Sequence, residues 1–386
     1  VYEKRSIKEV LTVVAHRQIK ELTEGDYIRG TWEQVQNATP PTGVLWKYPQ
    51  GVTLYGLLYA NRKVLHDPEI FDYVQTHNEI ISRQLEYLNW QIMTYGKYVY
   101  DRATEEYVKL YMLDHCGSMT NQILESVLRD SVTPTPQIHA IFNRVEDYVA
   151  HKQPRLVNGT FWRPESKEGI TLWSDDIYMV CPYLVRWYQY TGDRKYLDDA
   201  IHQIIHFASY VQDDDGLWYH GYFFKENKPS PFKWSRANGW VMVGIVEVLS
   251  VTPGDHPDRQ KLLTILKKQI DGLIPHQAES GRWYQVLDHH ELWEETSSTA
   301  MFAYSIARAV NRGWIDEDYL PIARKAFSGI NARITADGAI LGTCEGTGIK
   351  RDLETYANRK RPYDDNHAQG AVLLALTEFL LAQNLE

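Results

Sequence analysis

Hydrophobic positions recur along this chain with the period of an α-helix. The i, i+3, i+4, i+7 spacing is met first by Ile7, Val10, Leu11 and Val14. The same periodicity predicts twelve helices, over residues 5–22, 51–65, 68–93, 117–130, 136–152, 176–190, 194–212, 236–250, 257–273, 296–311, 317–333 and 366–384. Proline at the predicted starts, as at Pro68 and Pro136, and Gly192 just past an end agree with these boundaries.

A second pattern separates the predicted helices two by two, namely a glycine followed by large apolar residues. It occurs at 43–46, 96–100, 159–162, 216–219, 281–284 and 338–341, at intervals of 53 to 65 residues. Each interval holds two predicted helices, so the repeating unit is a helical hairpin plus a short extended segment.

Six such hairpins could form an open solenoid or close into a ring. Solenoids usually have tighter periods and polar capping repeats, whereas both terminal helices here are apolar. We therefore predict an all-α (α/α)6 barrel, a single domain over residues 1–386, with the extended segments at one rim.

The amino-acid composition restricts the classes of partner that this chain could bind. The chain has 12 Trp and 26 Tyr among 386 residues, and their flat faces suit sugar rings as well as cores. A formal charge of -9 without a basic run argues against nucleic acid, and no apolar stretch reaches the ~18 residues of a membrane span. No feature indicates an oligomeric state. The chain begins at Val1 rather than Met, so we expect a removed export signal and a periplasmic or extracellular protein.

Cysteine and histidine usage indicates no metal or other cofactor. The three cysteines, Cys116, Cys181 and Cys344, lie far apart and are expected to be buried thiols. The acidic and histidine-rich stretch 288–295 looks like a metal site, but its spacing does not match one, and a solvated loop is the simpler interpretation.

Adjacent carboxylates stand out at Asp175 and Asp176, between Trp173 and an apolar helix. Desolvation raises the pKa of a carboxyl group, which suits a general acid. The simpler interpretation is a helix N-cap, which one of the two is expected to be. An equivalent loop-to-helix junction one hairpin earlier carries Asp114, so a closed ring would place Asp114 and Asp175 on one rim.

Further polar and aromatic residues gather before the helix at 236–250. They include His220, Arg236 and Trp240, the last two spaced to share a helix face. An arginine beside a tryptophan suits a carboxylated sugar, although a structural arginine capping a helix end is the alternative. Tyr48 could reach the same cavity or pack beneath the rim, and the long non-helical stretch 343–366 is a candidate loop over the site.

Taken together, these motifs resemble glycoside hydrolase family 105, the unsaturated rhamnogalacturonyl and glucuronyl hydrolases, and more distantly family 88. The resemblance rests on Trp173-x-Asp175-x-x-Tyr178-Met179-x-x-Pro182, Leu113-Asp114-His115, Tyr219-His220, Trp234-x-Arg236-x-x-Gly239-Trp240, Glu295-Thr-Ser-Ser-Thr-Ala-Met-Phe302 and Gln369-Gly370. The family has an (α/α)6 barrel.

The resemblance implies hydration of a 4,5-unsaturated uronic acid at the non-reducing end of a lyase-generated oligosaccharide. It assigns the acid and base to Asp175, leaving Asp176 as the cap, and makes Asp114 a second acidic residue that orients the sugar or the water. Substrate binding falls to Tyr48, Trp173, His220, Arg236 and Trp240. No metal and no covalent intermediate are implied.

Two departures from relatives affect the expected substrate. Arg163 stands where some relatives carry histidine, and it could meet an anionic group such as a sulfate or form a surface pair. The residues before Gln369 also differ, so ulvan or another glucuronic-acid polymer stays open beside pectin. The alternatives are an inverting glycosidase with Asp114 as acid and Asp175 as base, and a non-catalytic sugar-binding toroid.

Overall fold

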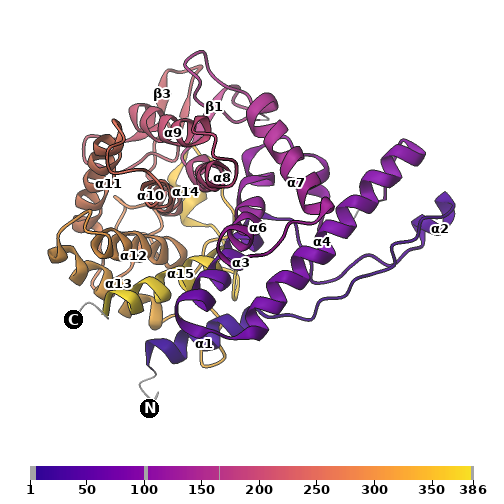
Figure 1. Ribbon diagram of the computed structural model, residues 1–386. Coiled ribbons are helices and arrows are strands. Elements are labelled where there is room, and N and C mark those ends of the chain that lie inside the picture. Colours follow the sequence, from indigo (N-terminus) through magenta and orange to yellow (C-terminus); the bar gives the residue numbers. More distant parts are fainter. Residues whose placement is uncertain (1–5, 100–102, 165, 384–386) are drawn as a thin grey trace.

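Six inner helices form a closed ring in the computed structural model, which describes residues 6–99, 103–164 and 166–383 (Figure 1). The inner helices are α3 (Tyr48–Ala60), α6 (Gly117–Arg129), α8 (Asp176–Thr191), α10 (Ser235–Leu249), α12 (Thr296–Asn311) and α15 (Asn366–Gln383). Each packs on the next, and α15 packs on α3. Every residue of α10 is buried, as expected for a helix surrounded by others.

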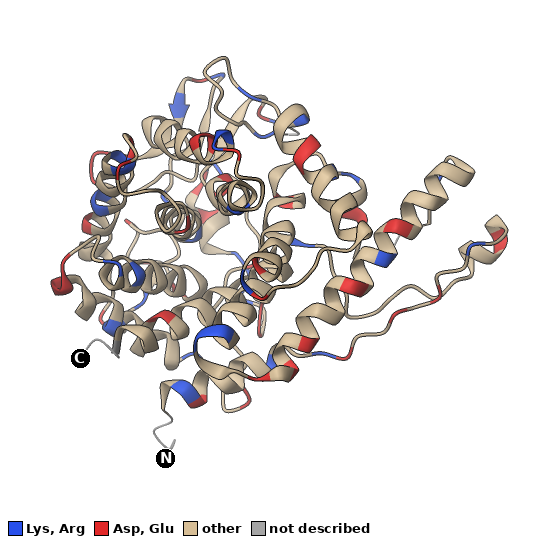
Figure 2. Cartoon of the chain, in the orientation of Figure 1, with Lys and Arg blue, Asp and Glu red and all other residues tan. Residues whose placement is uncertain are grey.

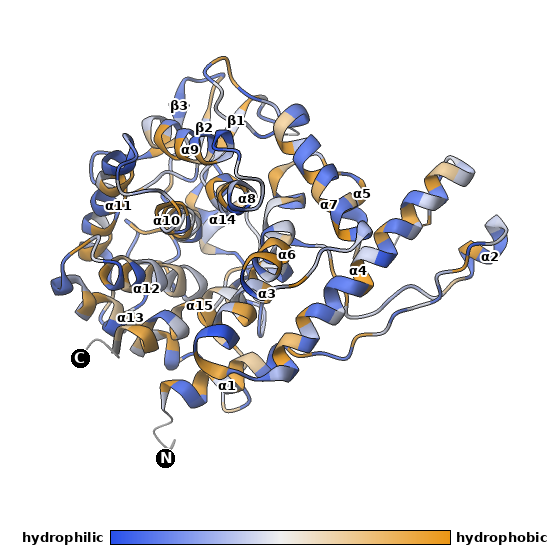
Figure 3. Cartoon of the chain, in the orientation of Figure 1, coloured by the Kyte–Doolittle hydropathy of each residue, from blue (hydrophilic) through white to orange (hydrophobic). Residues whose placement is uncertain are grey.

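A second layer of helices surrounds this ring. It comprises α1 (Ile7–Gln18), α4 (Pro68–Tyr95), α7 (Pro136–Asp147), α9 (Lys195–Val211), α11 (Arg259–Leu273) and α13 (Leu320–Asn331). These helices are amphipathic, with one apolar stripe against the ring, and hydrophobic and hydrophilic residues alternate along α4 in Figure 3. Inner and outer helices alternate along the chain, so the predicted (α/α)6 barrel is confirmed.

The predicted helices are found close to their expected limits, with shorter elements between them. The first helix ends at Gln18 rather than at 22, and the helix expected at 136–152 continues past Asp147 only as a π-turn. The additional elements are α2 (Trp32–Gln36), α5 (Glu105–Val108), α14 (Leu353–Ala357), the π-turns Asn61–Leu65 and Tyr148–Lys152, and the 3-10 turns Leu113–His115, Ile274–His276 and Glu317–Tyr319.

Extended segments lie at the rim where the inner helices begin. They form β1 (Thr171–Trp173), β2 (Gly221–Phe223) and β3 (Lys228–Pro229), antiparallel in that order, and a second pair, β4 (Trp283–Tyr284) and β5 (Glu294–Glu295). Of these strands, only β4 lies within an extended segment predicted from the sequence. The pairing of β1 with β2, in which Trp173 lies opposite Gly221, was not predicted.

The repeated glycine has the same role in the last four hairpins. Gly159, Gly216, Gly281 and Gly338 all have φ between 85° and 93°, a conformation that favours glycine. Each turn is closed by an antiparallel bridge, the four being Arg155 to Phe161, Gln212 to Trp218, Gln277 to Trp283 and Ile334 to Ile340. The second segment is different, because Gly96 ends α4 and Tyr100 lies outside the described residues.

Charged groups are buried in the ring toward the C-terminal ends of the inner helices. The Glu247 carboxylate accepts hydrogen bonds from Arg186 (2.6 Å), Tyr55 (3.0 Å) and Tyr304. Arg308 lies 3.5 Å away on the other side. This network fills the barrel at that end, so the rim of strands is the end at which a site is formed.

Outside the ring, α2 and the C-terminal half of α4 project away from the barrel (Figure 1). Acidic and basic residues are interspersed around the outer helices (Figure 2). In the described ranges, no helix is long and apolar enough to cross a membrane. The three cysteines are free and buried, as predicted.

Candidate active site

Asp175 lies at the rim, between β1 and the first turn of α8. Its side chain faces His220, which follows the fourth rim turn, with Asp175 Oδ2 3.3 Å from His220 Nε2. Asp175 is 6% exposed and His220 is fully buried. The two atoms are not aligned as a hydrogen bond, and within the described part of the chain neither has a hydrogen-bonding partner.

Trp173 forms a wall beside this pair. Its ring centre lies 5.9 Å from that of His220, and its indole N–H is a third buried polar atom without a partner among the described residues. Buried polar atoms are almost always hydrogen-bonded in folded proteins. Three exceptions at one place therefore mark the position where a bound water or a polar substrate would complete the site.

The rim brings Asp114 and Asp176 to a single arginine, Arg163. The guanidinium donates to Asp114 at 2.7 and 3.1 Å and to Asp176 at 2.7 and 3.3 Å. The starts of α6 and α8 lie close enough together for one arginine to reach both carboxylates. A Cβ at Gly117, in α6, would lie 1.6 Å from the carbonyl oxygen of Met179, in α8.

These contacts correct two expectations. Arg163 is only 8% exposed and is paired with two carboxylates, so it does not form the expected surface pair, and its contact with a substrate anion stays a prediction. Asp176 is engaged by Arg163, and no side-chain cap is present at the start of α8. Burial raises the pKa of Asp176 to about 7, and the charge of Asp114 adds to this while Arg163 opposes it.

Aromatic side chains lie beneath the rim. The ring of Tyr48 is 6.1 Å from that of Trp240 and 5.6 Å from that of His367. Trp240 in turn stacks on Tyr178 at 4.5 Å. Burial raises the pKa of Tyr48, on which the charges of Arg236, Asp114 and Asp175 also act. Tyr48 therefore packs beneath the rim near the predicted charged residues, and its contact with a sugar stays a prediction.

Arg236 is fully buried and holds neighbouring backbone. It donates to the carbonyl oxygens of Cys344 and, at 2.8 Å, Glu345. Glu295 accepts the Cys344 N–H at 2.9 Å and so anchors the same residue. Arg236 was expected to bind a uronate or to cap a helix end. The structure shows it holding a loop, and uronate binding stays a prediction. Its Nε atom alone lacks a partner among the described residues.

That loop, residues 343–365, is the segment predicted to cover the site, and we call it the covering loop. Gly348 packs against Trp173, since a Cβ there would lie 2.8 Å from the indole Cη2. Helix α14 of the covering loop places the Tyr356 hydroxyl 2.6 Å from His220 Nδ1. The sequence analysis missed Tyr356, because nothing local distinguishes it from the other tyrosines.

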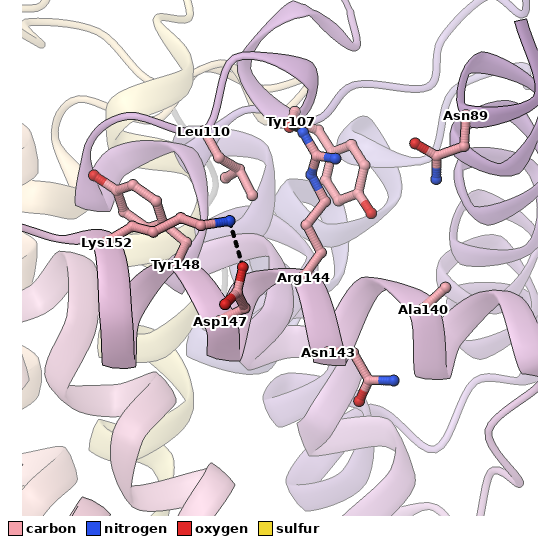
Figure 4. A pocket seen from close by; sticks show the side chains of 9 residues that line it. All are labelled: Asn89, Tyr107, Leu110, Ala140, Asn143, Arg144, Asp147, Tyr148 and Lys152. Carbon is pink, nitrogen blue, oxygen red and sulfur yellow. Dashed lines mark hydrogen bonds and ion pairs between the residues drawn. The ribbon is translucent and has the colours of Figure 1, made fainter. Parts of the chain in front are cut away.

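A surface cavity lies away from this site. It measures about 430 Å³ and is lined by residues of α4, α5, α7 and the chain around them (Figure 4). None of the predicted site residues lines it. Its cations are engaged, since Lys152 pairs with Asp147 and Arg144 donates to the Val108 carbonyl. In the ranges that the structure describes, no cluster of three or more His, Cys, Asp or Glu could hold a metal ion.

Comparison with known proteins shows which protein families and curated proteins this chain is similar to. The model of Glycosyl Hydrolase Family 88 matches residues 14–383. The unsaturated rhamnogalacturonyl hydrolase YesR of Bacillus subtilis is 24% identical over 343 residues, which are 87% of this chain and 90% of that protein. An unsaturated 3S-rhamnoglycuronyl hydrolase of Alteromonas sp. is 28% identical over 221 residues, 54% of this chain and 51% of that protein.

Solved structures support the fold. A crystal structure from Salmonella enterica, described as a possible member of the GH105 family, aligns over 100% of this chain and 97% of its own. The TM-score is 0.76 and the identity 22%. At that identity the likeness supports the (α/α)6 barrel and leaves the chemistry to the site.

Proposed function

The chain belongs to Glycosyl Hydrolase Family 88, and on this premise we propose that it hydrates the C4=C5 double bond of an unsaturated uronic acid. The unsaturated sugar is the non-reducing end of an oligosaccharide produced by a polysaccharide lyase. The products are a keto-uronic acid and the shortened saccharide. Residues 1–386 act as a single catalytic domain.

Asp175 is the acid and base of this reaction. Its carboxyl group protonates C4, which moves the positive charge to C5 and the ring oxygen. The resulting carboxylate then accepts a proton from the water that adds to C5. The hemiketal so formed opens to a C5 ketone, and the hemiacetal left at C1 releases the shortened saccharide. Positioned proton transfer of this kind contributes about 10²- to 10⁴-fold to rate.

One observation carries the choice of a single acid and base. Of the three aspartates at the rim, Asp114 and Asp176 share Arg163, whereas Asp175 lies beside His220 and, among the described residues, pairs with no arginine or lysine. An inverting glycosidase needs two carboxyl groups that act on opposite sides of the glycosidic bond. With Asp114 held by a bidentate arginine, Asp175 is left as the carboxyl group able to exchange protons with a substrate. Asp114 keeps an orienting role.

The remaining residues shape the sugar site. Trp173 presents an aromatic face, and its free indole N–H can donate to a sugar oxygen. Tyr48 packs against Trp240, and His220 lies beside Asp175. The names of both curated relatives given above contain a rhamnose unit, so we propose that the unsaturated uronic acid is linked to rhamnose, as in digests of pectin or ulvan.

The test is the loss of ultraviolet absorbance as the unsaturated bond disappears. Wild-type protein should remove that absorbance from pectin-lyase or ulvan-lyase digests. Asp175→Asn should lower the rate at least about 10²-fold while leaving the circular dichroism unchanged. Asp147→Asn, at an exposed aspartate paired with Lys152, is the matched control and should keep full activity.

Two outcomes would count against the proposal. Turnover of saturated oligosaccharides alone would favour the inverting glycosidase. A wild-type protein that binds the digests, with no difference between it and Asp175→Asn in any measured property, would favour the sugar-binding toroid.

A further inference from the structure

The covering loop places the fully buried side chain of Tyr356 beside His220. Its ring packs in a small apolar cluster with Trp234 and Val286, apart from the main core. Among the described residues, its hydroxyl oxygen has two hydrogen-bonding neighbours, the Lys350 backbone N–H at 3.1 Å and His220 Nδ1 at 2.6 Å. This contact joins two residues that are 136 positions apart in the chain.

The two neighbours determine the direction of the hydrogen bonds. The Lys350 N–H can only donate, so the Tyr356 oxygen accepts from it. The phenol hydrogen then needs an acceptor, and His220 Nδ1 is the one at hand. The opposite arrangement, with Nδ1–H donating, would leave the phenol hydrogen buried without an acceptor, which costs free energy. Burial also raises the pKa of Tyr356, so the phenol keeps its proton.

An imidazole that accepts at Nδ1 carries its hydrogen at Nε2. His220 Nε2 is the atom that faces Asp175 Oδ2 at 3.3 Å. We propose that Tyr356 is a positioning residue, which holds His220 as the Nε2–H tautomer so that an N–H donor, and not a lone pair, faces Asp175. This inference rests on the proposed function only for its catalytic consequence.

That consequence follows from the charge that Asp175 gains. When Asp175 gives its proton to C4, negative charge develops on its carboxylate, and an N–H group 3.3 Å away stabilises that charge. A lone pair in the same place would repel that charge. The covering loop supplies the tyrosine, so the Nε2–H tautomer is favoured while the loop is seated on Trp173.

The experiment compares wild type, Tyr356→Phe and a matched control. Tyr356→Phe keeps the ring that packs in the cluster and removes only the hydroxyl. Tyr87→Phe is the control, because Tyr87 is also buried and loses one short hydroxyl bond, 2.6 Å to the Ile28 carbonyl, at a distant place on α4. We expect kcat of Tyr356→Phe to fall about tenfold with KM within twofold, and Tyr87→Phe to match wild type.

A readout without substrate tests the tautomer itself. Long-range ¹H–¹⁵N spectra of protein with ¹⁵N-labelled histidines report which ring nitrogen of each of the 14 histidines carries the hydrogen. The His220 signal is identified as the one that is missing from the spectrum of His220→Gln. Wild type should show His220 protonated at Nε2 and bare at Nδ1, and Tyr356→Phe should show a mixed tautomer population.

Three results would overturn the inference. They are a wild-type His220 protonated at Nδ1, a Tyr356→Phe spectrum identical to wild type, and a Tyr356→Phe variant in which only KM changes. If wild type fails to turn over unsaturated uronides, the proposed function falls, and the spectra still decide the tautomer.

Discussion

Because Asp114 and Asp176 share Arg163, the free energy of unfolding depends on the ionisation of Asp176. One guanidinium serves two carboxylates that are largely withdrawn from water, so one of them is poorly compensated. Burial raises the pKa of Asp176 to about 7. The perturbation that tests this is Asp176→Asn, which keeps the shape of the side chain and abolishes its titration.

The magnitude follows from the two pKa values. In the unfolded chain the pKa of an aspartate is about 3.9, and in the folded protein that of Asp176 is about 7. The folded state therefore binds the proton more tightly. This stabilisation is complete below about pH 4 and is lost as the pH rises to 7. About 3 pH units at about 1.4 kcal/mol each give about 4 kcal/mol over the full range.

The assay is urea unfolding followed by tryptophan fluorescence between pH 5 and pH 8. Because Asp176→Asn does not titrate, its free energy of unfolding should rise relative to wild type by about 2 kcal/mol from pH 5 to pH 7 and level off by pH 8. Asp147→Asn, at an exposed carboxyl, should show no such rise. A constant difference between Asp176→Asn and wild type over this range would refute the reasoning, since it would mean that Arg163 keeps both carboxylates ionised.

Three further predictions concern the buried arginines and their partners. Arg163→Met should lower the free energy of unfolding by about 3 to 5 kcal/mol at pH 8, measured by urea titration, because it leaves Asp114 and Asp176 without their cation. Glu247→Gln should destabilise the protein by a similar ~3 to 5 kcal/mol at pH 7, measured in the same way. Because its charged partners lower the pKa of Glu247 to about 2, the wild-type advantage should be present above about pH 4 and shrink as the pH falls toward 2. Arg236→Ala should increase hydrogen exchange of the amides at 344–350, measured by mass spectrometry, because the covering loop loses its buried anchor, and unchanged exchange there would contradict this role.

Much of the fold was predictable because its signals are local. Helix periodicity depends on residues three and four positions apart, and prolines such as Pro68 and Pro136 mark helix starts through their own backbone geometry. The repeated glycine is also local, since each turn needs a left-handed residue at one position. Because the six helical hairpins are similar in length, few packing arrangements bury the apolar face of every helix.

The candidate site was predictable only in part. Asp114 and Asp175 were expected on one rim, and the structure places both there, with His220 beside Asp175. The proposed roles of the site residues stay predictions. The ion pairs of Arg163 with Asp114 and Asp176, and the bonds of Arg236 to a distant loop, could not be inferred from neighbouring residues.

By itself, the sequence determined a ring of helical hairpins with aspartates and aromatic residues at one rim. Only the tertiary structure decided which charged and polar groups bind one another. Arg163 reaches Asp114 across 49 residues, Arg236 reaches the Cys344 carbonyl across 108, and Tyr356 reaches His220 across 136. Periodicity and caps act within about one helical turn, whereas these contacts depend on how distant helices and the covering loop pack.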